Sequence, residues 1–239
     1  MDTTYPDIAR LIDHALLAPT LTVSALEAGL AQARSYDVAS VCILPYYVRR
    51  ASECLADSAV KTSTTIGFPH GGQAREVKVA EARRALDDGA DELDMVVNVS
   101  QVLSDGWDYV SDEVRAVVEL CHARGKKLKL IFETAYLAET HKRRLCEIAG
   151  ALAVDWVKTS TGFGPGGATL ADLKLMREAS PAFVQVKASG GVRDLDTLLA
   201  FRPFVTRIGT SHTRAILDEY RVRAGLSPIA SVDAPSGGY

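Results

Sequence analysis

The sequence lacks the features that mark membrane, exported and nucleic-acid-binding proteins. No apolar run approaches the roughly 18 residues of a membrane-spanning helix, and the chain does not begin with a basic region followed by an apolar one. The formal net charge is −3, and Lys and Arg are not clustered among aromatic side chains. We therefore expect a cytoplasmic protein with a small-molecule partner, one that binds neither a membrane nor a nucleic acid.

Cysteine is scarce as well. Cys42, Cys54, Cys121 and Cys146 show no CxxC spacing, which is typical of reduced thiols in the cytoplasm and unlike a disulfide framework. Cys42 falls in an apolar run, where we expect a buried thiol.

Spacings typical of metal or nucleotide binding are also missing. The five histidines show no HxH or HxxxH spacing. They are His14, His70, His122, His141 and His212. No glycine-rich dinucleotide-binding turn follows the first apolar run. The sequence therefore predicts an activity that needs no metal and no other cofactor.

What the chain does contain is a regular alternation of short β-branched or apolar runs with longer helix-patterned segments. The runs predicted as strands are residues 11–17, 39–44, 61–68, 92–98, 127–133, 155–160, 183–189 and 206–210. The helical segments include residues 23–36, 73–88, 107–124, 140–149, 170–178 and 195–201. Repeated βα units form parallel sheets with right-handed crossovers. Eight units in 239 residues predict an α/β fold, a single-domain (β/α)8 TIM barrel, over an open doubly wound sheet.

The predicted barrel spans residues 1–226. Residues 227–239 are rich in Pro, Gly and Ser, and they are expected to form a flexible C-terminal tail. The oligomeric state does not follow from the sequence, and a homodimer is retained as an option.

Charged residues interrupt several of the predicted strands. Strand alternation turns Asp94, Lys129 and Lys187 toward the barrel interior, and Lys158 shares the face of Trp156. Buried charges are costly unless they pair with one another, so their convergence at a catalytic centre is expected. A lysine amine removed from water loses proton affinity and can form a Schiff base with a carbonyl. The alternative for Lys158 is a strand-end lysine that extends into solvent.

Glycines follow the last three predicted strands, where such barrels bind phosphate. The residues that we expect to bind phosphate are Gly162, Gly190, Gly191, Gly209 and Ser211. Glycine lets backbone N–H groups approach an anion, and the helix after Ser211 adds a favourable dipole. Each glycine could instead serve only a tight turn. Arg193 and Arg207 lie nearby and are expected to be surface residues.

Several motifs resemble those of the deoxyribose-phosphate aldolase family over nearly the whole chain. They are Ile12–His14, Ser40–Cys42, Thr65–Pro69, Leu93–Asn98, Val157–Phe163, Val186–Arg193 and Arg207–Ser211. The resemblance implies a metal-free class I aldolase of deoxyribonucleotide catabolism. Such an enzyme reversibly cleaves 2-deoxy-D-ribose 5-phosphate to D-glyceraldehyde 3-phosphate and acetaldehyde.

The same resemblance implies roles for individual residues. Lys158 would form the Schiff base, Lys187 would be the second active-site lysine, and Asp94 would be the carboxylate of the proton relay. Asp13 and Lys129 are expected to be supporting charges. Tyr239 resembles a terminal tyrosine that assists proton transfer in some members, and the resemblance places Cys42 near the pocket.

Three other functions remain open at this point. A phosphosugar isomerase on the same barrel would use a carboxylate base and no covalent lysine. A lysine-bound pyridoxal phosphate enzyme would show a visible absorbance band. A non-catalytic phosphosugar-binding barrel would not require Lys158, Lys187 and Asp94 to converge.

Overall fold

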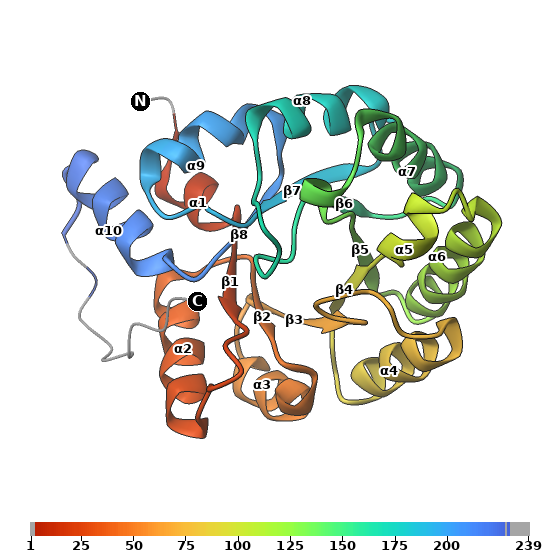
Figure 1. Ribbon diagram of the computed structural model, residues 1–239. Coiled ribbons are helices and arrows are strands. Elements are labelled where there is room, and N and C mark those ends of the chain that lie inside the picture. The colour runs from red at the N-terminus through yellow and green to blue at the C-terminus, as the bar shows by residue number, and fades with distance from the viewer. Residues whose placement is uncertain (1–2, 228, 230–239) are drawn as a thin grey trace.

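A computed structural model describes residues 3–227 and 229. Eight parallel strands form a closed barrel in which each strand pairs with the next and β8 returns to β1. The strands lie in the middle of Figure 1, with the helices around them. The strands are β1 (Ile12–Leu16), β2 (Ser40–Ile43), β3 (Lys61–Ile66), β4 (Glu92–Val96), β5 (Lys127–Ile131), β6 (Trp156–Lys158), β7 (Gln185–Ser189) and β8 (Arg207–Thr210). The predicted single-domain (β/α)8 barrel is therefore confirmed.

Helices precede the first strand, connect successive strands and follow the last one. They are α1 (Tyr5–Ala9), α2 (Val23–Tyr36), α3 (Val48–Leu55), α4 (Arg75–Asp87), α5 (Val99–Leu103), α6 (Trp107–His122), α7 (Glu139–Ala151), α8 (Leu170–Ala179), α9 (Leu195–Phe201) and α10 (Thr213–Arg223). Short 3-10 turns are η1 (Pro45–Tyr47), η2 (Thr134–Tyr136) and η3 (Arg202–Phe204). Among residues 3–227 and 229, no helix has both the length and the apolar character needed to cross a membrane.

Short polar residues begin several of these helices. The side chains of Thr22, Asn98, Thr169 and Asp194 each accept a hydrogen bond from the backbone N–H three residues further on. Such caps satisfy an N–H that has no partner inside the helix. They fix where each helix starts, and with it the length of the loop at the carboxyl end of the preceding strand.

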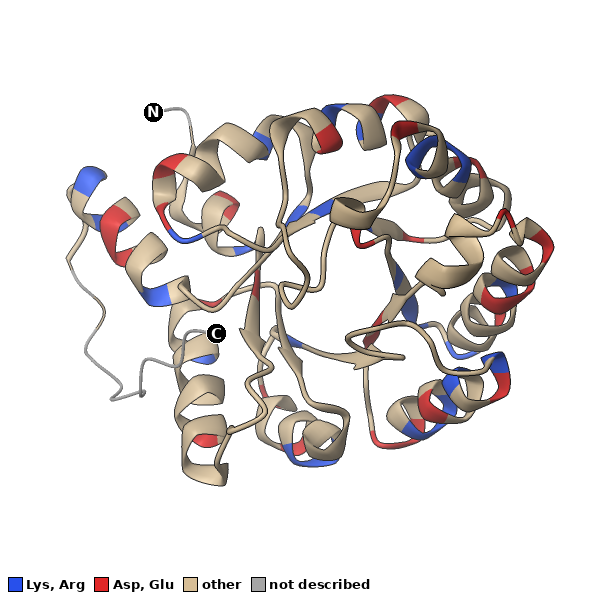
Figure 2. Ribbon diagram, in the orientation of Figure 1, with Lys and Arg blue, Asp and Glu red and all other residues tan. Residues whose placement is uncertain are grey.

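The hydrophobic core lies between the barrel and the surrounding helices. Leu93 and Met95 of β4 and Leu128 of β5 belong to this core, whereas Asp94 and Lys129 between them are fully buried in polar contacts inside the barrel. This is the alternation that the sequence predicts. Figure 2 shows acidic and basic positions on the strands as well as on the outer helices.

The sixth strand is shorter than predicted, because β6 ends at Lys158 and not at residue 160. The hydroxyl groups of Thr159 and Thr161 form hydrogen bonds with neighbouring segments of the chain. Thr159 Oγ1 donates to the carbonyl oxygen of Ser189, and Thr161 donates to the carboxylate of Glu133. These side-chain hydrogen bonds compete with regular pairing and end the strand.

The predicted tail, residues 227–239, lies almost entirely outside the described residues. Tyr239 belongs to that part of the chain. The boundary at residue 226 and the role of the terminal tyrosine therefore stay predictions.

Candidate active site

A pocket opens at the carboxyl ends of the strands, with a cavity volume of about 100 Å³. Its wall includes Lys158 of β6, Lys187 of β7, Asp13 of β1 and Cys42 of β2. All four side chains are almost completely buried. The sequence-predicted lysines therefore converge on one cavity, and Lys158 does not extend freely into solvent.

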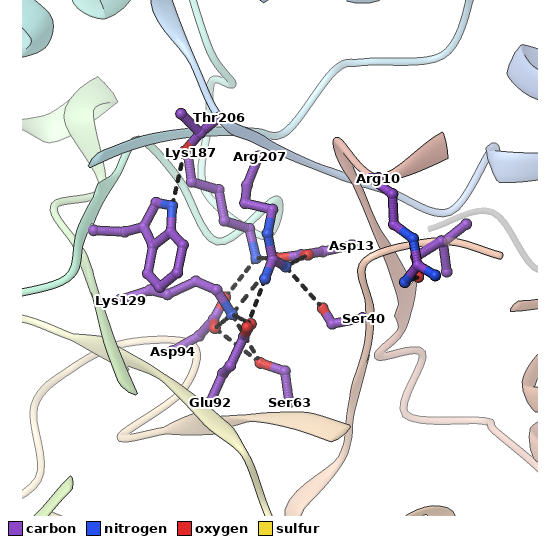
Figure 3. Close-up of polar contacts among 12 residues, drawn as sticks. Arg10, Asp13, Ser40, Ser63, Glu92, Asp94, Lys129, Lys187, Thr206 and Arg207 are labelled. Atoms are coloured by element: carbon purple, nitrogen blue, oxygen red, sulfur yellow. Dashed lines mark hydrogen bonds and ion pairs between the residues drawn. The ribbon is translucent and has the colours of Figure 1, made fainter. Parts of the chain in front are cut away.

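Asp94 lies between the two lysines. Its Oδ2 accepts hydrogen bonds from Lys158 Nζ at 2.7 Å and from Lys187 Nζ at 2.8 Å. Its Oδ1 accepts from Lys129 Nζ at 2.8 Å and from Ser63 Oγ at 3.0 Å. Figure 3 shows how Asp94, Lys129 and Lys187 point toward one another. Both carboxylate oxygens of Asp94 are thus used to hold amines.

The two pocket lysines have different proton affinities. Burial lowers the pKa of Lys158, and the charge of Lys187 lowers it further, while Asp94 opposes both effects. Burial also acts against the charged form of Lys187, but Asp13 and Asp94 outweigh it and raise the pKa of that amine. Lys158 is therefore the amine that loses its proton first.

The carboxylates beside these lysines stay ionised. Burial alone would raise the pKa of Asp94, but Lys129, Lys158 and Lys187 together hold it well below its ordinary value. The pKa of Asp13 is also lowered, because Arg207, Lys187 and Lys129 outweigh its burial. Asp13 and Lys129 thus belong to the same cluster of charges, as the sequence suggested.

Cys42 combines two expectations from the sequence. It is buried, and it lines the pocket. Burial raises the pKa of its thiol and Asp94 adds to this, although the neighbouring lysines oppose both effects. The thiol is therefore protonated at neutral pH.

The predicted phosphate-binding residues all line the same pocket, on the side of β6, β7 and β8. They are Gly162, Gly190, Gly191, Gly209 and Ser211. Three have positive φ, at 88° for Gly162, 84° for Gly190 and 82° for Gly191. Such backbone angles favour glycine. The helix α10 begins two residues after Ser211.

These glycines are not equivalent. A Cβ on Gly190 would lie 2.9 Å from Gly167 Cα, so Gly190 is also required for the close packing of two loops. A Cβ on Gly191 would have no atom within 4 Å, so only its backbone angle and its position at the pocket restrict that residue. Gly191 is therefore the better position at which to test anion binding separately from packing.

Gly191→Val is expected to raise the KM for a phosphorylated substrate by about tenfold, equivalent to about 1.4 kcal/mol, and to leave the KM for its unphosphorylated counterpart nearly unchanged. The valine side chain would hinder the approach of an anion to the backbone. Gly125→Val is the matched control, because Gly125 also has positive φ and open space but lies in the turn before β5. Equal effects on both substrates would show that Gly191 serves the fold alone.

The expectation that Arg207 is a surface residue is wrong. Its guanidinium lies inside the barrel, where it pairs with Asp13 and with Glu92 Oε1, the latter at 2.5 Å. The guanidinium carbon lies over the Trp156 ring, 5.2 Å from the ring centre. Strand alternation would have turned Arg207 inward, because it is two residues before the inward-facing Gly209. Arg193 is exposed as expected, and it also lines the pocket.

Sequence reasoning also missed Glu133 and His212. Glu133 has a left-handed backbone conformation, φ 57° and ψ 63°, and its buried carboxylate accepts hydrogen bonds from the Thr161 amide and hydroxyl. This contact fixes the loop that carries Gly162. His212 lines the pocket next to Ser211. The sequence could have indicated this placement, because His212 directly follows Ser211, which was predicted to bind phosphate.

In the part of the chain that the structure describes, no group of three or more His, Cys, Asp or Glu side chains is arranged to hold a metal ion. A closed (β/α)8 barrel whose pocket is lined by a buried lysine of lowered pKa and by several glycines defines a barrel enzyme suited to lysine-dependent carbonyl chemistry. Residues 8–217 match the DeoC/LacD family of aldolases. The chain belongs to this family.

Individual relatives agree in sequence and in fold. The deoxyribose-phosphate aldolase of Rhodopirellula baltica is 56% identical, over 100% of this chain and 99% of that protein. The enzyme of the same name from Thermococcus gammatolerans is 44% identical over 90% of this chain and 97% of its own length. The tetrameric deoxyribose phosphate aldolase from Aeropyrum pernix superimposes with a TM-score of 0.84 at 31% identity, over 91% of this chain and 92% of that one.

The family match confirms the resemblance drawn from the motifs. The isomerase, the pyridoxal phosphate enzyme and the non-catalytic barrel are not favoured.

Proposed function

We propose that this protein is a class I deoxyribose-phosphate aldolase that reversibly cleaves 2-deoxy-D-ribose 5-phosphate to D-glyceraldehyde 3-phosphate and acetaldehyde. One observation carries this proposal: Lys158, with a lowered pKa, lines a pocket that is also lined by glycines suited to a phosphate. Relatives that are 56% and 44% identical bear this name. The substrates are therefore small phosphosugars and aldehydes.

Lys158 is the proposed nucleophile. Its neutral Nζ attacks C1 of the open-chain sugar, and the carbonyl oxygen takes a proton to give a carbinolamine. Loss of water leaves a protonated imine. The C3 hydroxyl then gives up its proton as the C2–C3 bond breaks, and the bonding electrons move toward the imine nitrogen. Glyceraldehyde 3-phosphate leaves, and an enamine remains on Lys158.

The second half of the reaction releases acetaldehyde. The enamine carbon takes a proton to form the acetaldehyde imine, and water hydrolyses that imine to free the lysine amine. Every step moves a proton, so a proton donor and acceptor must stay close to Lys158. Lys187 and Asp94 are the proposed partners, since Asp94 Oδ2 lies within 2.8 Å of both amines.

The proposed role of Asp94 is that of a fixed anion in the proton relay. It holds both amines in position and exchanges protons with the reacting groups through a bound water. Asp13 and Lys129 support it by pairing with Lys187 and Asp94 respectively. A terminal tyrosine, Tyr239, is a further proposed proton donor to the enamine.

The phosphate is proposed to bind at Gly162, Gly190, Gly191, Gly209 and Ser211. Backbone N–H groups and the start of α10 favour an anion there. We also propose a cytoplasmic location and a homodimer. Size measurement in solution would test the dimer, because the Aeropyrum pernix relative is tetrameric.

The most direct test combines two measurements. One is turnover of deoxyribose 5-phosphate with and without a chelator, and the other is borohydride trapping of the acetaldehyde adduct. Cleavage that survives the chelator, together with a two-carbon adduct on Lys158, is the expected result. Isomerisation of the phosphosugar without any adduct would overturn the proposal.

Asp94→Asn is expected to lower turnover by roughly 100-fold, a typical loss for a group that takes part in proton transfer. The amide is nearly isosteric but cannot hold two ammonium groups or return a proton. Removing the anion also lowers the pKa of Lys158 further, so raising the pH should not restore the rate. Turnover against pH and circular dichroism would be measured together. Full activity in a folded Asp94→Asn protein would remove Asp94 from the mechanism.

A further inference from the structure

Seven ionisable side chains lie together in the barrel interior, below and beside the pocket. They are Asp13, Glu92, Asp94, Lys129, Lys158, Lys187 and Arg207. The most exposed of them is Arg207, whose side chain is only 11% accessible. Three are carboxylates and four are bases. If Lys158 is the neutral amine, the remaining three cations balance the three carboxylates.

Six of these groups form a closed ring of alternating charge, which we call the ion-pair ring. Arg207 pairs with Asp13, which lies 2.5 Å from Lys187 Nζ. Lys187 and Lys129 each lie 2.8 Å from Asp94. Glu92 completes the ring, because it lies 2.5 Å from Lys129 Nζ and 2.5 Å from Arg207 Nη2. Figure 3 shows these six side chains converging.

Lys158 is attached to this ring but is not part of it. Its Nζ contacts Asp94 Oδ2 at 2.7 Å, and Asp94 already pairs with Lys187 and Lys129. The ring has no net charge without Lys158, so no carboxylate is left over to hold a seventh charge.

We propose that Arg207 is a positioning residue that keeps Lys158 available as a neutral amine, because it completes a charge-neutral ring beneath the nucleophile. The inference rests on the proposed function of Lys158. It assigns a role in that function to Arg207, which lies across the ion-pair ring from Asp94, the member that Lys158 contacts. Arg207 and Lys158 have no direct contact in this arrangement, and the effect passes through Asp13, Glu92, Lys187 and Asp94.

The proton balance explains the effect. Without Arg207, three carboxylates face only the ammonium groups of Lys129 and Lys187. The missing positive charge is then supplied by a proton, which binds the most basic vacant site. An amine is more basic than a carboxylate by about six pK units in water, so Lys158 takes that proton in preference to Asp13 or Glu92. Asp94 is already positioned to hold the resulting ammonium.

Other titratable groups near the ring do not alter this balance. Burial raises the pKa of Cys42, so its thiol is neutral. Burial lowers the pKa of His14 to about 4, and its ring contacts Thr213 on the helix side. Lys61 of β3 and Lys127 of β5 are exposed at the amino ends of their strands, where water screens their charge, and the amine of Lys127 lies 5.0 Å from the centre of the Trp156 ring.

Two single substitutions are expected to move the proton affinity of Lys158 in opposite directions. Arg207→Met removes a positive charge while keeping an unbranched stem beside Trp156, so the titration midpoint of Lys158 should rise by about one pH unit or more. Glu92→Gln removes a negative charge while keeping an oxygen acceptor, so the midpoint should fall by about one unit. Arg207→Lys keeps the charge and should leave the midpoint close to the original.

The midpoint can be measured without any turnover. Trace acetylation with acetic anhydride at a series of pH values labels only the neutral amine, and mass spectrometry of the peptide that contains Lys158 gives its titration curve. The double variant Arg207→Met/Glu92→Gln loses one charge of each sign, so its midpoint should return toward that of the unmodified protein. A purely structural role could not produce opposite shifts that cancel.

Several outcomes would overturn the proposal. The first is an unchanged titration midpoint of Lys158 in folded Arg207→Met. The second is a shift of that midpoint in the same direction in both single variants. The third is a double variant whose midpoint does not return toward that of the unmodified protein. If Arg207→Met does not fold, the downward shift in Glu92→Gln decides: its presence supports the charge-neutral ring, and its absence overturns it.

The proposed function is tested separately, by borohydride trapping of acetaldehyde on the unmodified protein. If no adduct forms on Lys158 but the midpoints shift as expected, the aldolase mechanism fails and the ring remains. If the adduct forms and the midpoints do not move, only the role of Arg207 fails.

Discussion

Lys158→Leu is expected to lower cleavage of deoxyribose 5-phosphate by roughly 10⁴-fold or more, the scale of loss seen when a covalent nucleophile is removed. Leucine has no amine with which to attack C1, and the two other lysines of the barrel interior cannot replace it. Lys129 is held by Glu92 and Asp94, and Lys187 by Asp13 and Asp94. The loss should therefore persist at every pH, unlike a loss caused by a protonated nucleophile.

The measurement pairs turnover with mass spectrometry after borohydride reduction in acetaldehyde. The unmodified protein should carry a two-carbon adduct on Lys158, and Lys158→Leu should carry none. Lys127→Leu is the matched control, since Lys127 is an exposed lysine on the neighbouring strand β5. An adduct on Lys187, or substantial activity in Lys158→Leu, would refute the assignment.

The fold followed from the sequence because each strand alternates between two different environments. Apolar residues such as Leu93 and Met95 face the helices, and residues such as Asp94 face the interior, so the period of two is visible in the sequence. The helices α1, α3 and α5 were not named from the sequence. Two of them are five residues long and α3 is eight, too short for a helical repeat to stand out.

The charged residues of the site could be recognised one by one, but their partners could not. The pairing of Arg207 with Asp13 joins residues 194 positions apart, and it exists only because β8 closes against β1. Local sequence around Arg207 gives no sign of this closure. Strand alternation places Arg207 on the inward face, but it does not identify Asp13 as its partner.

The contacts of Asp94 illustrate the same limit. The family resemblance implies a carboxylate in a proton relay, and strand alternation turns that carboxylate inward. Neither shows that three lysines from three different strands meet at its two oxygens. That meeting depends on the register of β4, β5, β6 and β7, and it decides which of the amines keeps its proton.

Lys187→Leu is expected to lower turnover at neutral pH by roughly 100-fold or more, through the protonation of Lys158. Lys187 is one of the three cations that balance Asp13, Glu92 and Asp94. When it is lost, Lys158 becomes the third cation, and its pKa rises because a nearby positive charge no longer opposes the ammonium form.

This explanation fixes the pH dependence of Lys187→Leu. The free amine of Lys158 is the deprotonated form, so a raised pKa moves the rise in activity to higher pH, and the residual rate should recover as the pH increases. The rate of imine formation with acetaldehyde, measured against pH, should show the same displacement. If Lys187 were instead only a proton donor to the carbinolamine, turnover would fall without any displacement of the imine profile. A displaced profile with partial recovery would therefore assign Lys187 to tuning the nucleophile, and an undisplaced one would assign it to proton transfer alone.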